Sequence, residues 1–312
     1  MKKKDELFNF AMTYLGKTDL IFGYLAALAI EKQNARRYAF CWTVIRYLDE
    51  IIDSTESSGE KRNILEKYCT LVDLISNNII EKTDMADDFE KCLFEYVKLD
   101  ATSNNETISL FQNILKSFEM DIERTGKILR WADYDHYLKY RSDSVLELYY
   151  VMYFNKKSPE VNQLAKDYAR TFQYVDDVCD FFDDFKIGQI NITQDELDSL
   201  QINSPDLKDA SSAIKFANRR KELILRHYFD FIKTVNSSTL PFYKKRYLKE
   251  SIGYNIDPII TNKFNPGYKI KLPFISIITR IASFKNQGLI FEILHKIIYL
   301  YCLIPWYRYK HS

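Results

Sequence analysis

Residues that interrupt helices are scarce in this chain. It has 312 residues but only 8 Gly and 7 Pro, far fewer than the roughly 12% that these two types supply in an average protein. Glycine weakens a helix through its conformational freedom, and proline removes a backbone donor. Alternation of apolar and polar residues, the mark of half-buried strands, never extends over a useful length. The composition therefore predicts an all-helical protein.

Several chemistries are excluded by what is missing. The five Cys are scattered without a CxxC pair, which argues against a zinc–thiolate site and favours reduced thiols in a cytoplasmic protein. No P-loop, GxGxxG or HExxH motif occurs, and the four His have no ligand spacing. The formal net charge of +1 gives no electrostatic basis for binding nucleic acid.

Long apolar runs are also absent. No stretch of about 18 apolar residues occurs, so no membrane-spanning helix is expected. The basic N-terminal segment 1–6 lacks the apolar run of a signal peptide. The apolar stretch 297–307 is too short to span a bilayer. We assign it to the core, the alternative being a peripheral contact with a membrane that supplies an apolar substrate.

Helical periodicity runs through most of the chain and predicts one all-α domain over residues 1–312, a helical bundle acting as a monomer or homodimer. Polar or proline-containing connections are expected at 54–59, 187–206 and 256–273. The short basic runs 219–221 and 244–246 are expected to be solvated. The alternative is that Lys215 and Arg219, or Lys244 and Arg246, meet a diphosphate if their helices face the cavity. The predicted helices cover residues 5–15, 19–32, 34–55, 60–82, 86–100, 106–127, 133–154, 160–186, 207–236, 240–255 and 274–304.

An acidic face stands out at residues 176–184. Asp176, Asp180 and Asp184 recur every four residues, so a helix places them on one face. Like charges at that spacing repel by a few tenths of a kcal/mol per pair. The alternative is the solvated face of an amphipathic helix, but solvated faces usually mix both signs. The pattern indicates a face that a cation neutralises.

A second acidic cluster follows an uncharged segment. Residues 38–45 carry no charge and are expected to be buried, whereas Arg46, Asp49 and Asp53 then appear on one face of the same helix. Charges on a buried helix are costly unless they are paired or bound to metal. A purely structural Arg–Asp pair is the alternative.

Two carboxylate clusters on two helices are what a Mg²⁺–diphosphate site requires, because Mg²⁺ takes oxygen ligands from a few carboxylates, water and substrate phosphates. Such ions act as Lewis acids while a diphosphate leaves. The carbocation that forms needs a dry cavity lined by aromatic rings. The predicted catalytic metal ligands are Asp49, Asp53, Asp176, Asp180 and Asp184, with Glu50, Asp177 and Asp183 as secondary ligands.

The same segments resemble the squalene/phytoene synthase family of isoprenoid synthases. The segment 46–53 fully matches its Arg-x-x-Asp-(Asp/Glu)-x-x-Asp signature. Asp180, Asp183, Asp184 and Gly188 match the spacing of its second acidic signature and the flap after it, and 137–147 is similar to a third region. The resemblance implies the class I isoprenoid synthase fold, a helical bundle around a central cavity, with a prenyl diphosphate substrate and several Mg²⁺ ions.

Some family positions differ here. The Arg before Asp180 is replaced by Cys179, and the flap Arg and Tyr are replaced by Gln189 and Asn191. The loss of these two arginines weakens the argument that the protein binds a second diphosphate. In the third region, Asp143 and Leu146 replace Gly, which is expected to narrow a tunnel for long prenyl chains.

The acidic face also has the spacing of class I terpene cyclases, and Arg141–Ser144 is similar to their diphosphate-sensing Arg-x-x-(Asp/Ser) element. A polar helix face is the alternative for that element. The predicted substrate-binding residues are Arg46, Arg141 and Ser144 toward the diphosphate and Phe40, Trp42, Tyr137 and Phe172 around the cation.

We therefore favour Mg²⁺-dependent ionisation of one farnesyl- or geranylgeranyl-type diphosphate, followed by cyclisation or rearrangement to a terpene without NADPH. The first alternative is head-to-head condensation of two prenyl diphosphates, as in squalene and phytoene synthases. A non-catalytic binding or assembly protein on the same fold is the alternative from another class.

Overall fold

The structure is a computed structural model that describes residues 6–249 except positions 55, 104–105, 204–206, 208, 243 and 246–247. Every regular element in that part of the chain is a helix, which confirms the predicted all-α class. The predicted helix 274–304, the apolar stretch 297–307 and the end of the predicted helix 240–255 lie outside the described residues. Within the described part, no helix combines the length and apolar character needed to cross a bilayer.

The described residues form two compact units. The first unit comprises residues up to Leu115 together with Leu148–Lys157, and the second comprises Lys116–Glu147 and the residues from Ser158 onward. Each unit is considered by itself, and the single domain over 1–312 remains a prediction, as do the oligomeric state and the location in the cell.

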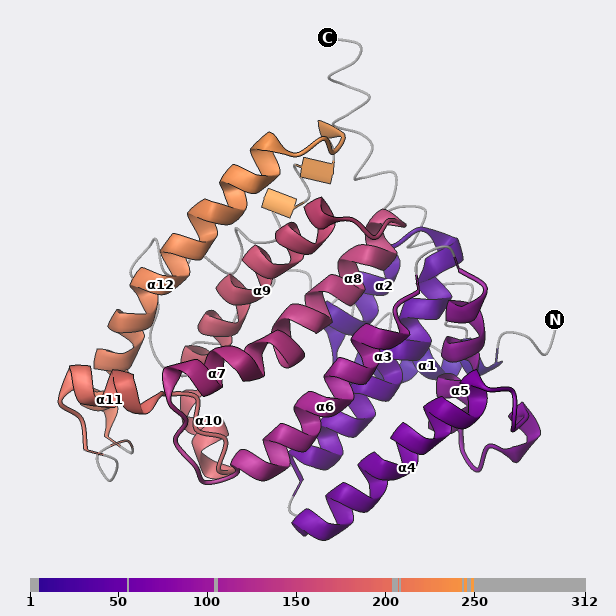
Figure 1. Ribbon diagram of the computed structural model, residues 1–312, viewed down its shortest axis with the longest axis horizontal. Helices are drawn as coiled ribbons and strands as arrows, with labels where there is room; N and C mark the ends of the chain where they lie inside the picture. The colour runs from indigo at the N-terminus through magenta and orange to yellow at the C-terminus, as the bar shows by residue number, and fades with distance from the viewer. Residues whose placement is uncertain are drawn as a thin grey trace. The chain divides into compact units, whose positions relative to one another are not determined.

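The first unit is built around one long helix, α3, which packs against α1 and α5, while α4 packs against α5 (Figure 1). Its buried segment is the uncharged run 38–45, in which no side chain is more than 7% exposed, as predicted. The elements of this unit are α1 (Glu6–Thr18), the π-helix η2 (Leu20–Leu25), α2 (Ala26–Ala29), α3 (Lys32–Ile52), α4 (Ser58–Ser76), the 3₁₀-helix η3 (Lys82–Asp84), α5 (Asp88–Ala101), the start of α6 (Ile108–Arg124) and most of α8 (Ser144–Phe154).

In the second unit, two long helices, α9 and α12, run side by side (Figure 1). Their apolar stripes meet through ring contacts, such as Tyr168 with Phe231 at 5.4 Å between centroids. The elements of this unit are the end of α6, α7 (Trp131–Leu138), the π-helix η4 (Lys139–Asp143), the first turn of α8, α9 (Pro159–Cys179), α10 (Phe181–Lys186), α11 (Gln194–Leu200) and α12 (Ala210–Ser237).

Two predicted boundaries in this unit are wrong. The predicted helix 160–186 is broken at Asp180, whose φ of −97° and ψ of 7° end α9 before α10 begins. The predicted connection 187–206 contains α11. That helix starts at a capping box, in which Thr193 and Glu196 satisfy each other's backbone donors.

Candidate functional site

The first acidic cluster lies at the C-terminal end of α3, where Arg46 pairs with two acids of its own helix. Its Nη1 is 2.7 Å from Asp49 Oδ2, and its Nε is 3.5 Å from Glu50 Oε1. The hydroxyl of Tyr14 donates to Glu50 Oε2 at 2.7 Å. Asp53 is exposed and ends the helix. The Arg–Asp pair that was the alternative for this cluster is therefore present, so the cluster carries its own counter-charge.

Trp42 lies one turn before Arg46 on α3 and is held by contacts with Asp19 and Tyr38. Its Nε1 donates to Asp19 Oδ2 at 2.7 Å, and Tyr38 stacks on its ring at 5.6 Å. Burial raises the pKa of Asp19, an effect that the Trp42 hydrogen bond and the Arg46 charge oppose. A Cβ added to Gly23 would lie 3.1 Å from Trp42 Cδ1, so glycine permits this close packing.

Phe40, predicted to line a cation cavity, belongs to the core of the first unit. It is 2% exposed and meets Phe8 edge to face at 6.2 Å. Six residues separate it from Arg46, which places it about 120° around the helix from the acidic cluster. That position argues against the expected contact with substrate.

The second acidic cluster lies where α9 passes into α10. Although the helix breaks at Asp180, the backbone N–H of Asp180 bonds to Asp176 O at 2.9 Å and that of Asp184 to Asp180 O at 2.8 Å. Burial and then the charges of Asp180 and Asp184 raise the pKa of Asp176, which the charge of Arg141 partly opposes. The three carboxylates are therefore close enough to repel one another.

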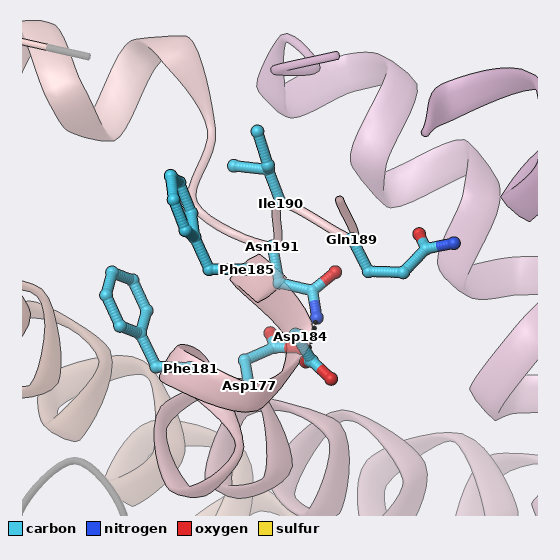
Figure 2. A pocket seen from close by; sticks show the side chains of 7 residues that line it. All are labelled: Asp177, Phe181, Asp184, Phe185, Gln189, Ile190 and Asn191. Atoms are coloured by element: carbon cyan, nitrogen blue, oxygen red, sulfur yellow. Dashed lines mark hydrogen bonds between the residues drawn. The ribbon is translucent and has the colours of Figure 1, made fainter. Parts of the chain in front are cut away.

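One of these carboxylates is fixed by a neutral amide. Asn191 Nδ2 donates to Asp184 Oδ2 at 2.7 Å (Figure 2). Arg124 Nη1 donates to Asn191 Oδ1 at 2.9 Å. Arg124 is anchored in turn by Asp121, at 2.8 Å from its Nε to Oδ1. No pattern in the sequence signals this chain of contacts, which holds Asp184 in one orientation.

Asp184 and Asn191 also line a small pocket (Figure 2). Gln189, which replaces the flap Arg of the family, is turned away from Asp184 and donates from Nε2 to Asp121 O at 3.2 Å. Gly188 has a φ of +81°, and its carbonyl accepts from Gly126 N at 2.8 Å. Glycine is required there, because a Cβ would lie 3.0 Å from Thr125 Cγ2.

Asp177, predicted as a secondary metal ligand, is instead part of a buried ion-pair network. It is fully buried, accepts from Tyr134 OH at 2.5 Å and lies 3.2 Å from Arg220 Nη1. Arg220 is also fully buried and pairs with Glu196 at 2.8 Å. The prediction that the run 219–221 is solvated is thus wrong for Arg220. Its place on the apolar stripe with Phe216, Ala217 and Ile224 was the signal in the sequence.

Two further predicted residues, Asp183 and Ser144, are each engaged by a neighbour in the sequence. Asp183 is exposed and pairs with Lys186 at 2.7 Å. Ser144 is 3% exposed, and its hydroxyl donates to Lys139 O at 3.0 Å. The hydroxyl of Ser144 is therefore engaged by its own helix rather than presented to a ligand.

The remaining predicted residues lie around the second cluster. The guanidinium of Arg141 stacks over Phe118 at 5.0 Å, within electrostatic reach of Asp176. Tyr137 is 3% exposed and lies under the Arg124 guanidinium at 4.3 Å. Phe172 is half-buried on α9, one turn before Asp176 and on the same face. Arg141 and Phe172 keep positions from which they can meet a substrate.

Among the described residues, no group of three or more His, Cys, Asp or Glu side chains is arranged to hold a metal ion. The donor chemistry nevertheless fits Mg²⁺, which keeps several waters and takes other ligands from substrate phosphates. The second cluster supports this fit, because its mutual repulsion would be relieved by a cation. These residues suit an ion that binds together with a diphosphate.

Two solved structures share this helical fold. Squalene synthase HpnC from Alicyclobacillus acidocaldarius matches with a TM-score of 0.65 and 13% identity, covering 84% of this chain and 95% of its own. A dehydrosqualene synthase crystallised with a ligand matches with a TM-score of 0.65 and 13% identity, covering 95% and 96%. The fold is therefore that of the isoprenoid synthases. The comparison with curated proteins gives no significant match.

The sequence model of the squalene/phytoene synthase family matches residues 23–231, which contain both acidic clusters. The chain belongs to the squalene/phytoene synthase family, which confirms the resemblance seen in its motifs.

Proposed function

We propose that the protein is a Mg²⁺-dependent prenyltransferase that condenses two prenyl diphosphates head to head. The observation that carries this proposal is that both acidic clusters lie intact inside the region matched to the family. Family membership supports condensation, the first alternative in the sequence analysis, more than the cyclisation favoured there.

Five aspartates of the two clusters are proposed to bind Mg²⁺ through their carboxylate oxygens: Asp49, Asp53, Asp176, Asp180 and Asp184. Bound Mg²⁺ would supply the Lewis acidity that offsets the charge of the departing diphosphate. Arg46 is suited to bind a diphosphate oxygen, because a guanidinium offers several donors in a fixed plane. It already orients Asp49 at 2.7 Å.

Within the second unit, Asn191 is proposed to keep Asp184 turned toward its ligand. Arg141 contributes a positive charge beside Asp176, where the family's Arg before Asp180 is missing. We propose that Arg141 replaces part of that lost charge and helps to hold a diphosphate.

A second candidate, conversion of one prenyl diphosphate to a terpene, is favoured by a specific observation. The two positions where the family has Arg carry Cys179 and Gln189, and the Gln189 amide is bonded to Asp121 O. These positions offer no cation to a second diphosphate. The two candidates share the ionisation step and differ in the number of substrates.

Product analysis distinguishes the candidates. Purified protein is incubated with Mg²⁺ and prenyl diphosphates of about ten to twenty carbons, and the extract is analysed by GC–MS alongside an assay of released diphosphate. Products with twice the carbon number of the substrate support condensation, and products with the same number refute it in favour of cyclisation. Absence of diphosphate release from every substrate would refute both and favour a binding protein.

A double variant tests the metal ligands in the same assay. Asp180→Asn with Asp184→Asn is expected to abolish diphosphate release. Asp133→Asn with Asp198→Asn, two exposed acids of the second unit, removes the same charge elsewhere and is expected to leave release unchanged. Normal release by the first double variant would overturn the assignment of these ligands.

A further inference from the structure

A second and larger pocket lies in the second unit, and none of the proposed metal ligands lines it. Its volume is about 560 Å³, within the range of roughly 300–1,000 Å³ typical of small-molecule sites. Its walls come from α7, α9, α11 and α12.

This pocket uses a different face of α9 from the acidic cluster. Lys166, Arg170 and Tyr174 recur every four residues and form one stripe along the helix. Six residues separate Arg170 from Asp176, which corresponds to a rotation of about 120° around the helix axis. None of the proposed metal ligands lines this pocket.

The acids in the pocket wall are already neutralised by cations. The pairs are Asp135 with Arg170 at 3.0 Å, Asp195 with Arg130 at 3.4 Å, and Glu196 with Arg220 at 2.8 Å. These pairs leave little negative charge to repel an anion.

Other cations of the wall remain available. Lys166 and Arg226 are exposed and make no ion pair or hydrogen bond with any residue that the structure describes. Arg170 is 3% exposed and is already paired, with Asp135 at 3.0 Å from Nη1 and with Asp143 at 2.9 Å from Nη2. The pocket therefore presents the positive charge of two exposed cations, Lys166 and Arg226.

The rest of the wall is aromatic or apolar. Trp131 and Tyr174 lie 6.2 Å apart between ring centroids, and His227 lies 5.6 Å from Tyr174. Burial and the neighbouring Arg170 lower the pKa of His227, so its ring is neutral at pH 7. Leu223 adds an aliphatic surface. These side chains can cover a planar or apolar group attached to an anion.

We propose that this pocket binds a small phosphate monoester carrying an aromatic or short apolar group, with Lys166 and Arg226 around the phosphate and Trp131 and Tyr174 beside the apolar part. Binding requires no Mg²⁺ and is independent of the proposed reaction. The pocket would be a second ligand site of the protein, separate from its acidic clusters.

Calorimetry with phenyl phosphate in the presence of EDTA tests the proposal on the full-length protein. Saturable binding is expected, and the double variant Lys166→Ala with Arg226→Ala is expected to weaken it at least about tenfold, since each charge-assisted hydrogen bond contributes strongly. Two controls should bind as the wild type does: Lys215→Ala with Lys233→Ala, which removes two exposed cations of α12 outside the pocket, and Asp180→Asn with Asp184→Asn.

Further binding experiments distinguish a phosphate monoester from free phosphate and from a lipid headgroup. Inorganic phosphate is expected to bind more weakly than phenyl phosphate, because it leaves the aromatic wall unused. Quenching of tryptophan fluorescence by phenyl phosphate should disappear in Trp131→Phe. Absence of saturable binding up to millimolar concentration would overturn the proposal, as would equal weakening by the control cations. Capture by phosphatidic acid vesicles without binding of phenyl phosphate would also overturn it and assign the cations to a membrane surface.

Discussion

The two acidic clusters balance their charge in different ways. In the first cluster, Arg46 lies within ion-pair distance of both Asp49 and Glu50. In the second, burial and then the like charges of Asp180 and Asp184 raise the pKa of Asp176, and the charge of Arg141 opposes them in part. The first cluster contains a cation from its own helix, whereas the carboxylates of the second repel one another.

We infer from this difference that the first cluster is arranged for stability without a cation, whereas the second is arranged to bind one. A compensated cluster can be stable without a bound cation, whereas a face of like charges lowers stability until a cation binds. Active sites commonly retain such unfavourable arrangements because function requires them. Removing one carboxylate of the second cluster should therefore raise the free energy of unfolding of the metal-free protein while it lowers the activity.

The largest expected effect on stability comes from Arg220, a buried cation that is paired with Asp177 and Glu196. Arg220→Met would leave Asp177 and Glu196 buried without their cation, which is expected to lower the free energy of unfolding by about 3–5 kcal/mol. Chemical denaturation measures the change. Arg219→Met, at an adjacent exposed position, should change it by less than about 0.5 kcal/mol. Equal small losses would show that the network is not important for stability.

The next effect compares the two clusters directly. Asp176→Asn is expected to reduce diphosphate release at least about 10²-fold, the scale for losing one group that stabilises charge in a transition state. In EDTA the same variant should be more stable by a few tenths of a kcal/mol, because like-charge repulsion is removed. Thermal unfolding in EDTA and a diphosphate assay measure the two quantities.

The matched variant in the first cluster is Asp49→Asn, which removes a partner of Arg46. Its metal-free stability should fall by about 0.2–1 kcal/mol, the range for a partly exposed ion pair. A decrease in stability for Asp176→Asn as well would contradict the proposed difference between the clusters.

The features predicted correctly from the sequence are local ones. The shared face of Asp176, Asp180 and Asp184 follows from helical spacing alone, as does the pair Arg46–Asp49, which was the alternative to a metal site in the first cluster. The break at Asp180 did not spoil the second prediction, because backbone hydrogen bonds four residues apart continue through it.

The features that were missed depend on contacts between distant residues. Asn191 and Arg124 are 67 positions apart, and no periodic pattern links them. Arg220 could have been found, because it interrupts an apolar stripe of α12, but its charged neighbours suggested a solvated run. Its partners Asp177 and Glu196 lie on other helices, which a single sequence does not bring together.

A smaller effect is expected when the hydrogen bond that orients Asp184 is removed. Asn191→Leu removes the amide that bonds to Asp184 at 2.7 Å and should raise the Mg²⁺ concentration needed for half-maximal activity about 10–100-fold, as for other residues that orient metal ligands. The maximal rate at saturating Mg²⁺ should fall much less. Gln194→Leu, a nearby half-buried amide that bonds to Asp198 instead, serves as the control. A fall in maximal rate with an unchanged Mg²⁺ requirement would contradict the positioning role.

The smallest expected effect on activity lies in the first cluster, where the charge of Arg46 leaves the least to disturb. Tyr14→Phe removes the hydroxyl that donates to Glu50 at 2.7 Å, but Arg46 remains beside that carboxylate. Stability should fall by about 0.5–1.5 kcal/mol, the usual contribution of one hydrogen bond, with little change in the Mg²⁺ requirement. Denaturation and Mg²⁺ titration of the variant measure both. If the Mg²⁺ requirement rose as strongly as in Asn191→Leu, the first cluster would depend on its hydrogen-bond partners as much as the second, and the contrast between the two clusters would be lost.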